Sequence, residues 1–243
     1  MSLQCPADIT RILLLGDSVA NGNWWTDQAQ ILSALLENQL NGRSPHPTAV
    51  LNASANSWGP RNELAYVQRF GTFESRWVIL LLNTDDLFAT VPTSLQVGRD
   101  RNYPDRYPPL ALLELYQYYL HKPQPIPGLK AVQNEGGDRV GRNLEAIASL
   151  HQLCQQQHSQ LIIALSPLRR EVRPGQPRDY EGVARQRLQD LAGELAVPYL
   201  DLLPQFNQVG ASLYRDHIHL SPQGNRMVAE VLGIWVQKQD DST

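Results

Sequence analysis

The sequence contains few cysteines, little excess charge of either sign and no long apolar run. Only Cys5 and Cys154 occur among its 243 residues, too few for a disulfide framework, and they lack metal-ligand spacing. The formal net charge of −3 provides no general attraction to nucleic acid or to an anionic membrane. We therefore expect neither a disulfide-stabilised scaffold nor a nucleic-acid partner.

The chain also lacks an apolar segment that would place it in a membrane. The first apolar run, residues 12–15, is too short for a signal core or a membrane span, and no basic segment precedes it. We expect a cytoplasmic protein without a membrane span. The 42% of hydrophobic residues is enough for one substantial core.

Short apolar runs alternate with amphipathic stretches along most of the chain. Runs such as RILLLGDS (residues 11–18) and WVILLLN (residues 77–83) are typical of fully buried parallel strands. The stretch DQAQILSALLENQLNG (residues 27–42) has the apolar spacing of an amphipathic helix and ends at glycine. This alternation predicts one α/β domain over residues 1–243, a three-layer α/β/α sandwich with a central parallel sheet.

The alternation breaks between about residues 89 and 140. This segment has many prolines, and its stretch PPLALLELYQYYL (residues 108–120) predicts a helix rich in leucine and tyrosine. So long an excursion is typical of a lid or a substrate-binding insertion. A helix that only packs on the body explains the pattern equally well, so both interpretations stay open.

Polar residues directly follow the predicted strands. The stretch VILLLNTDDLF (residues 78–88) passes from apolar residues into Asn83, Asp85 and Asp86. Ser18 follows the first strand in the same way, near the positive end of the next helix, where a developing negative charge is favoured. Ligands of open parallel sheets bind beyond the carboxyl ends of the strands. We therefore expect the functional site at this edge.

The segment YRDHIHLSPQGNRM (residues 214–227) holds one carboxylate and two imidazoles. Asp216 and His219 are three residues apart before a turn and the last predicted helix, so one loop can present both to the same point. A carboxylate that orients an imidazole, which in turn deprotonates a serine, is an activated-nucleophile arrangement. His217 is one residue out of step and should point elsewhere, so we predict His219 as the base.

The two terminal motifs together resemble those of the SGNH/GDSL hydrolase superfamily. GDSVANG (residues 16–22) is similar to its first block, and DHIHLSPQG (residues 216–224) to its last. The resemblance covers most of the chain outside the insertion. It implies a flavodoxin-like sandwich and carboxylic esters as substrates: acetylated sugars, lipids or small acyl esters. It also implies a triad of Ser18, His219 and Asp216, with no metal and no cofactor.

The two middle motifs depart from the family pattern. The family's second block supplies a glycine N–H to the oxyanion; Ser57 takes that place here, with Gly59 as the alternative. The third block, G-x-N-D, supplies an asparagine amide, but NTDD (residues 83–86) puts Asp85 at that position. An ionised carboxylate donates no hydrogen bond. Losing one oxyanion donor costs roughly 100- to 1,000-fold in turnover.

Three arrangements would keep such a site active. Burial and the neighbouring acids could raise the pKa of Asp85, so that it donates as a neutral acid. Asn83, two residues earlier and on the same face of the strand, could supply the amide. Backbone donors alone could also suffice. We adopt the first arrangement as a hypothesis.

Two further segments supply candidate binding residues. Trp24 and Trp25 follow the nucleophile turn closely enough to wall a pocket, although packing against the core fits the sequence equally well. Arg169 or Arg170, after the fourth predicted strand, could pair with Asp85 or bind a negative substrate. An arginine beside Asp85 would favour its ionised form and oppose the neutral-acid hypothesis.

Ester hydrolysis on a small-molecule, carbohydrate or lipid ester is the leading function. Acyl or acetyl transfer would use the same triad and acyl-enzyme. A non-catalytic descendant that binds an acylated ligand is a further alternative. Clustered carboxylates also suit Mg²⁺ or Mn²⁺ in a phosphoesterase, although the sequence has no phosphate-binding loop. The residues of that alternative are Asp17, Asp85, Asp86, Asp216 and His219.

Overall fold

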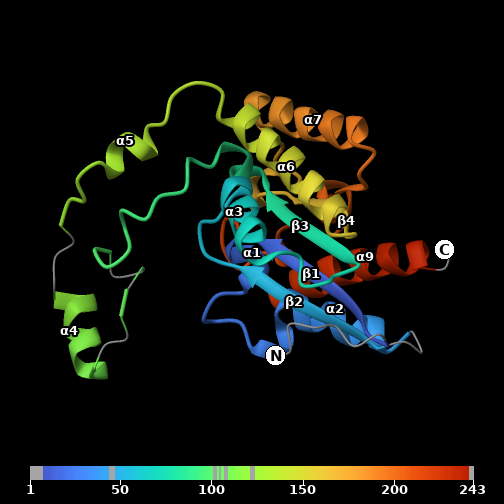
Figure 1. Ribbon diagram of the computed structural model, residues 1–243, viewed down its shortest axis with the longest axis horizontal. Helices are drawn as coiled ribbons and strands as arrows, with labels where there is room; N and C mark the ends of the chain where they lie inside the picture. The colour runs from blue at the N-terminus through green and yellow to red at the C-terminus, as the bar shows by residue number, and fades with distance from the viewer. Residues whose placement is uncertain are drawn as a thin grey trace. The chain divides into compact units, whose positions relative to one another are not determined.

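The computed structural model describes most of the chain (Figure 1). The described residues are 8–43, 47–100, 103, 105–106, 109–120 and 124–240. The chain divides into two compact units, one formed by Met1–Ala89 with Val140–Thr243 and the other by Thr90–Arg139.

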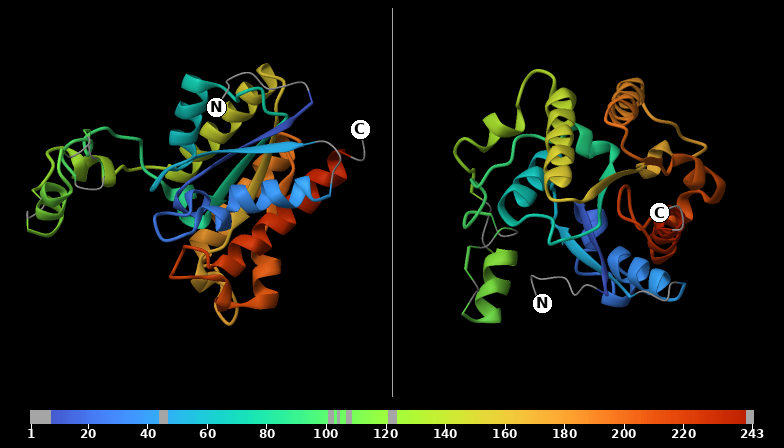
Figure 2. Two further views of the ribbon diagram at one scale, coloured as in Figure 1. Left: turned by 90° about the horizontal axis from the view of Figure 1, so that it is seen from below. Right: turned by 45° about the vertical axis from the view of Figure 1, so that its right-hand side comes forward.

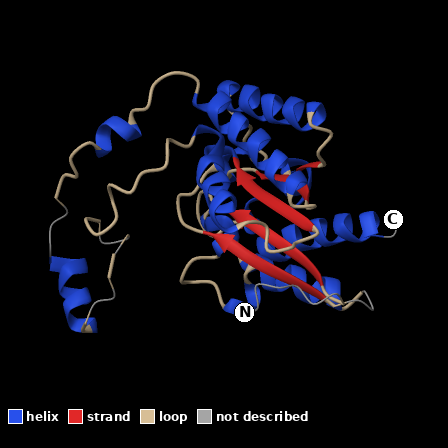
Figure 3. Ribbon diagram, viewed as in Figure 1, coloured by secondary structure: helices blue, strands red, loops and turns tan. Residues whose placement is uncertain are grey.

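The first unit is built on a five-stranded parallel sheet in the order β2-β1-β3-β4-β5 (Figure 3). The strands are β1 (Thr10–Gly16), β2 (Thr48–Ser54), β3 (Trp77–Asn83), β4 (Gln160–Ser166) and β5 (Tyr199–Asp201). Gly16 pairs with Ser54 of β2 and with Leu81 of β3, and Asn83 pairs with Ser166 of β4. The carboxyl ends of the first four strands therefore lie along one edge.

Helices cover both faces of this sheet (Figure 2). They are α1 (Ser18–Asn21), α2 (Leu32–Asn41), α3 (Pro60–Phe70), α6 (Arg139–Gln156), α7 (Asp179–Glu194), α8 (Leu203–Val209) and α9 (Pro222–Asp240). α2, α8 and α9 pack on one face, and α3, α6 and α7 pack on the other. The structure confirms the predicted three-layer α/β/α sandwich with a central parallel sheet.

The sheet has a hydrophobic core on each face, because side chains along each strand point alternately to one face and to the other. On β1, Ile12 and Leu14 contribute to the core under α2 and α9, while Leu13 and Leu15 contribute to the core under α3, α6 and α7. All four side chains are fully buried. Burying such a side chain stabilises the fold by about 1.5–3 kcal/mol. Burial on both faces explains why these strands read as unbroken apolar runs.

Most predicted elements are present, with two local differences. The predicted helix of residues 27–42 begins as a 3-10 turn, η1 (Gln28–Gln30), whose N-cap Asp27 accepts the Ala29 N–H; α2 starts only at Leu32, because Ile31 is extended. The stretch after β5 contains a short helix that the sequence pattern did not predict, α8, which has proline in its first turn. The other 3-10 turns are η2 (Thr84–Phe88), η3 (Arg169–Glu171) and η4 (Ala211–Leu213).

The second unit contains two helices among its described residues, α4 (Ala111–Leu120) and α5 (Leu129–Gln133). α4 lies within the stretch predicted as helical, residues 108–120. The role of the segment as a lid or substrate-binding element stays a prediction. Across the described residues, no helix combines the length and hydrophobicity needed to cross a bilayer.

Candidate active site

The turn after β1 places Ser18 at the carboxyl edge of the sheet. Asp17 caps the short helix α1, and its Oδ1 accepts the Val19 N–H at 2.8 Å. Ser18 is the first residue of α1 and is half-buried. The turn requires glycine at position 16, because a Cβ there would lie 2.7 Å from the Leu81 carbonyl oxygen. These local contacts thus place the Ser18 hydroxyl at the end of the buried strand β1.

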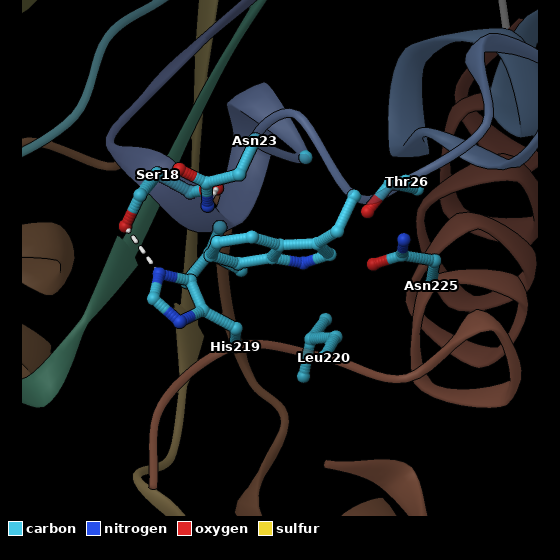
Figure 4. A pocket seen from close by; sticks show the side chains of 9 residues that line it. Ser18, Asn23, Thr26, His219, Leu220 and Asn225 are labelled. Atoms are coloured by element: carbon cyan, nitrogen blue, oxygen red, sulfur yellow. Dashed lines mark hydrogen bonds between the residues drawn. The ribbon is translucent and has the colours of Figure 1, made fainter. Parts of the chain in front are cut away.

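The loop before α9 brings Asp216 and His219 to the same place. Asp216 Oδ1 accepts the backbone N–H groups of Ile218 and His219 at 2.9 and 2.8 Å. Asp216 Oδ2 lies 2.7 Å from His219 Nδ1. His219 Nε2 lies 3.0 Å from Ser18 Oγ, a contact that Figure 4 shows as a dashed line. The three predicted triad residues therefore form one continuous hydrogen-bonded line.

The electrostatics of the loop suit an ionised carboxylate. Partial burial tends to raise the pKa of Asp216, but hydrogen bonds from Ile218 and His219 outweigh it and lower that pKa to about 2. His217 is 84% exposed, and its Nδ1 is 3.8 Å from Asp216 Oδ1. His217 is therefore not in the hydrogen-bonded line, and His219 occupies the position of the base.

Asn83 joins Asp17 and Asp86 beside Ser18. Its Nδ2 donates to Asp17 Oδ2 at 3.0 Å and to Asp86 Oδ2 at 2.8 Å, and only 1% of the residue is exposed. Asp17 Oδ2 also lies 3.3 Å from Ser18 Oγ. Because both amide hydrogens of Asn83 are donated to carboxylates, the expectation that Asn83 supplies an oxyanion donor does not fit the structure.

A buried acid that the sequence analysis did not single out lies behind this cluster. Glu63 of α3 is fully buried, and burial followed by the charge of Asp17 raises its pKa well above the ordinary value. Burial, then Asp17 and Glu63, likewise raise the pKa of Asp86. Glu63 lies one helical turn before Val67, which is also buried. The four-residue spacing of Glu63 and Val67 places both residues on the buried face of α3, and this spacing is the sequence signal that could have identified Glu63.

The position of Asp85 does not fit the hypothesis that this residue is a buried neutral acid. Its side chain is 58% exposed, so the burial that would favour protonation is absent. Arg170 Nη2 lies 3.9 Å from Asp85 Oδ1, so the carboxylate has a guanidinium as its neighbour. Arg170 also forms a two-point ion pair with Glu181. The structure therefore contradicts the burial on which the hypothesis depends.

Arg170, rather than Arg169, is the arginine beside Asp85. The Arg169 N–H donates to the His217 carbonyl at 3.0 Å, and Arg169 is exposed. This contact ties the loop after β4 to the loop that carries His219. The binding role expected for Arg169 has no contact with Asp85 to support it.

The two candidate backbone donors differ in their surroundings. Ser57 is exposed and has φ of 61°, a left-handed conformation that favours glycine, and no acceptor for its N–H is found within the described residues. The Gly59 N–H is directed to Asn62 Oδ1 at 3.3 Å, and Gly59 is buried at the start of α3. Of the two candidates, Ser57 is therefore the one whose N–H has no acceptor among the described residues, and its role as an oxyanion donor stays a prediction.

A small hollow lies beside the hydrogen-bonded line (Figure 4). It is lined by Ser18, Val19, Gly22, Asn23, Trp25, Thr26, His219, Leu220 and Asn225. Trp25 thus lines a hollow as expected, whereas Trp24 is 82% exposed and does not line it. Trp24 instead meets the ring of Trp25 edge-on, with centroids 4.7 Å apart.

The carboxylates at this edge do not form a metal-ligand set. In the part of the chain that is described, no group of three His, Cys, Asp or Glu side chains could hold a metal ion. Asp17 and Asp86 bind Asn83, and Asp85 is paired with Arg170. This arrangement does not support the metal-dependent phosphoesterase alternative.

Solved structures share the architecture of this chain at low sequence identity. A lipase/acylhydrolase from Enterococcus faecalis is 16% identical, with 95% of this chain and 96% of that chain covered and a TM-score of 0.58. TesA is also 16% identical, with coverages of 93% and 96% and a TM-score of 0.59. A variant of Axe2, an acetyl-xylooligosaccharide esterase from Geobacillus, has 16% identity, coverages of 92% and 92% and a TM-score of 0.61. These likenesses establish the fold.

Sequence comparison identifies the family directly. No curated protein matches the chain. Residues 14–227, however, match the GDSL-like lipase/acylhydrolase family, a range that includes the nucleophile turn, the Asp216–His219 loop and the first turns of α9. The chain therefore belongs to the GDSL-like lipase/acylhydrolase family and is a carboxylic ester hydrolase.

Proposed function

We propose that Ser18, His219 and Asp216 are the catalytic triad and that hydrolysis proceeds through an acyl-enzyme on Ser18. The observation that carries the proposal is the hydrogen-bonded line, with Nε2–Oγ at 3.0 Å and Nδ1–Oδ2 at 2.7 Å. With Nδ1–H donated to the ionised Asp216, the lone pair of Nε2 faces the Ser18 hydroxyl. This is the arrangement that activates a serine.

The reaction has two stages with balanced proton transfers. Ser18 Oγ attacks the ester carbonyl carbon while its proton passes to His219 Nε2, and Asp216 stabilises the resulting imidazolium. His219 then protonates the departing alcohol, which leaves the acyl group on Ser18. A water molecule then attacks the acyl carbon while its proton passes to His219, and His219 returns that proton to Ser18 Oγ as the bond to the acyl group breaks and the acid leaves.

The oxyanion is stabilised in this proposal by backbone donors. Ser57 supplies an N–H that has no acceptor within the described residues. Ser18 supplies the second N–H, which must exchange its hydrogen bond to the Asp17 carboxylate for one to the oxyanion. Asp85 donates nothing in its ionised form. The wild-type enzyme therefore works without a side-chain oxyanion donor, and its turnover is limited accordingly.

A fluorophosphonate probe together with p-nitrophenyl acetate hydrolysis tests the triad. We expect the probe to label Ser18, and expect Ser18→Ala to abolish both labelling and hydrolysis while EDTA has no effect. Undiminished hydrolysis by Ser18→Ala would refute the proposal. Transfer shares the acyl-enzyme, so adding an acceptor alcohol and measuring the ratio of new ester to free acid separates the two outcomes.

A further inference from the structure

His219 has a third close neighbour besides Ser18 and Asp216. The indole ring of Trp25 meets the imidazole with centroids 5.0 Å apart and ring planes at 77°. This near-perpendicular arrangement is one that aromatic rings prefer, and such pairs are worth about 0.5–1.5 kcal/mol beyond their buried area. The indole of Trp25 therefore packs against one side of the His219 imidazole.

Trp25 is itself fixed to the nucleophile turn. Gly22 and Asn23 both have positive φ, 81° and 52°, which turns the chain back towards α1. The Asn23 side chain donates to the Ser18 carbonyl at 3.2 Å. Figure 4 shows Asn23 beside Ser18 on one turn and His219 on the facing loop. Trp25 thus connects the segment that carries the nucleophile to the segment that carries the base.

The same indole also contacts the first residue of the His219 loop. The guanidinium carbon of Arg215 lies 4.8 Å from the centroid of the Trp25 ring, a cation–π distance. The Arg215 N–H donates to the His219 carbonyl at 2.8 Å, which closes the base of the loop. Among the described residues, no ion pair joins Arg215 to the adjacent Asp216. The guanidinium therefore lies over the indole and forms no ion pair with the carboxylate that orients His219 in the described part of the chain.

We propose that Trp25 is a positioning residue that holds the His219 ring against Ser18 and keeps Arg215 from competing for Asp216. The proposal rests on the proposed function, because positioning matters only if His219 transfers the proton. Trp25 acts through His219 and takes no part in the bond changes.

The physical reason is that one hydrogen bond at each ring nitrogen does not fully fix the ring. Rotations about the Cα–Cβ and Cβ–Cγ bonds together can still shift the imidazole and carry Nε2 away from Ser18 Oγ. A displacement of about 1 Å at a reacting atom can lower the rate about 100-fold. Trp25 opposes that shift, and its cation–π contact removes the nearest alternative partner of Asp216.

The test compares Trp25→Ala, Trp25→Phe and Trp25→Ala/Arg215→Gln on p-nitrophenyl acetate. We expect Trp25→Ala to lower kcat about 10- to 100-fold while KM stays within about threefold. Trp25→Phe should recover most of the activity because a phenyl ring can keep the perpendicular contact. Adding Arg215→Gln to Trp25→Ala should recover about threefold in kcat.

Phe70→Ala is the matched control. Arg69 stacks on Phe70 at 5.1 Å, so the variant removes another aromatic ring under a guanidinium. Phe70 is the last residue of α3, at the opposite end of that helix from Gly59. Its kcat should stay within about twofold of wild type, as for most surface substitutions. A Trp25→Ala enzyme with equally unchanged kcat would overturn the proposal, and so would a Trp25→Phe enzyme as slow as Trp25→Ala.

A spectroscopic readout separates this inference from the proposed function. The proton shared by His219 Nδ1 and Asp216 should give a downfield NMR signal in the wild type that broadens or disappears in Trp25→Ala and persists in Phe70→Ala. Unchanged signal in Trp25→Ala contradicts the positioning role even if the protein hydrolyses no ester. Loss of the signal in an enzyme whose Ser18→Ala variant stays active would instead contradict the proposed triad.

Discussion

His219 Nε2 and Ser18 Oγ are 3.0 Å apart although the two residues are separated by 201 positions in the chain. The sheet explains this contact. β1 delivers Ser18 to the carboxyl edge, while α9 packs with α2 on the face that Ile12 and Leu14 of β1 line. The loop before α9 therefore arrives at the point where β1 ends.

Replacing the orienting carboxylate tests the proposed triad more finely than removing the nucleophile. In Asp216→Asn, the amide can donate to Nδ1 and so place the imidazole proton on Nε2, where it blocks acceptance of the serine proton. We expect kcat to fall about 10,000-fold, the cost of the same change in a comparable triad. Fluorophosphonate labelling of Ser18 should slow in parallel, while the circular dichroism spectrum stays unchanged.

The ionisation of Asp216 should also make the free energy of unfolding depend on pH in the acidic range. Its pKa in the folded protein is about 2, below the ordinary value of 3.8, so its contribution is fully present above about pH 4 and is lost as pH falls towards 2. The side chain is 38% exposed, so solvent screening leaves about 1 kcal/mol at most. Urea unfolding of wild type and Asp216→Ala at pH 6 and pH 3 measures the difference. A difference in unfolding free energy between the two proteins that is larger at pH 3 than at pH 6 would contradict the lowered pKa of Asp216.

Gly16→Ala should damage the nucleophile turn. The added Cβ would lie 2.7 Å from the Leu81 carbonyl and 2.8 Å from the Ala20 Cβ, so β1 or α1 must shift. We expect a loss of about 1–3 kcal/mol in unfolding free energy, as for overpacking, and a large fall in kcat. Gly182→Ala in α7 is the matched control, because its Cβ meets nothing within 4 Å and alanine favours the helix. Chemical denaturation and p-nitrophenyl acetate kinetics measure both effects.

Asp85→Asn should raise turnover. The substitution removes a carboxylate and introduces an amide donor at the position where the family pattern has asparagine. We expect kcat to increase about 10- to 100-fold at neutral pH, less than a complete oxyanion donor supplies, because Asp85 is exposed. Asp85→Ala removes the charge without adding a donor and should gain less. If the asparagine variant gains nothing at neutral or alkaline pH, Asp85 does not face the oxyanion.

The sheet and the pairing of Asp216 with His219 were predictable because their signals are local, whereas the meeting of Ser18 with His219 was expected from the two terminal motifs. β1 and β3 are buried on both faces, so each reads as a continuous apolar run, and the acid and base lie three residues apart in one loop. The short helix α8 was missed because seven residues with proline in the first turn give too little periodicity to distinguish a helix from a loop.

The surroundings of the triad depend on contacts between distant segments. Period-two alternation places Asn83 and Asp85 on one face of a strand, but the strand ends at Asn83, and Asp85 lies in the 3-10 turn η2. That change of backbone buries Asn83 between Asp17 and Asp86 and exposes Asp85. Arg170, from the turn after β4, becomes the partner of Asp85 through the packing of separate segments, which no spacing in the sequence encodes.

Glu63 should limit stability at neutral and alkaline pH. Its side chain is fully buried, and neither carboxylate oxygen has a hydrogen-bond partner within the described residues. Burial, followed by the charge of Asp17, raises its pKa well above the ordinary value of 4.5. The unfolded chain then releases this proton at lower pH than the folded protein does, so the free energy of unfolding falls as pH rises above about 4.5.

Glu63→Gln removes that proton linkage while keeping the side-chain shape. We expect the variant to gain stability relative to wild type as pH increases from 5 to 8, with the smallest difference at pH 5. Glu145→Gln, on α6, is the control, because Glu145 is exposed. Urea midpoints at the two pH values measure the effect. A Glu63→Gln difference that is independent of pH would show that Glu63 has the same protonation in the folded and unfolded states.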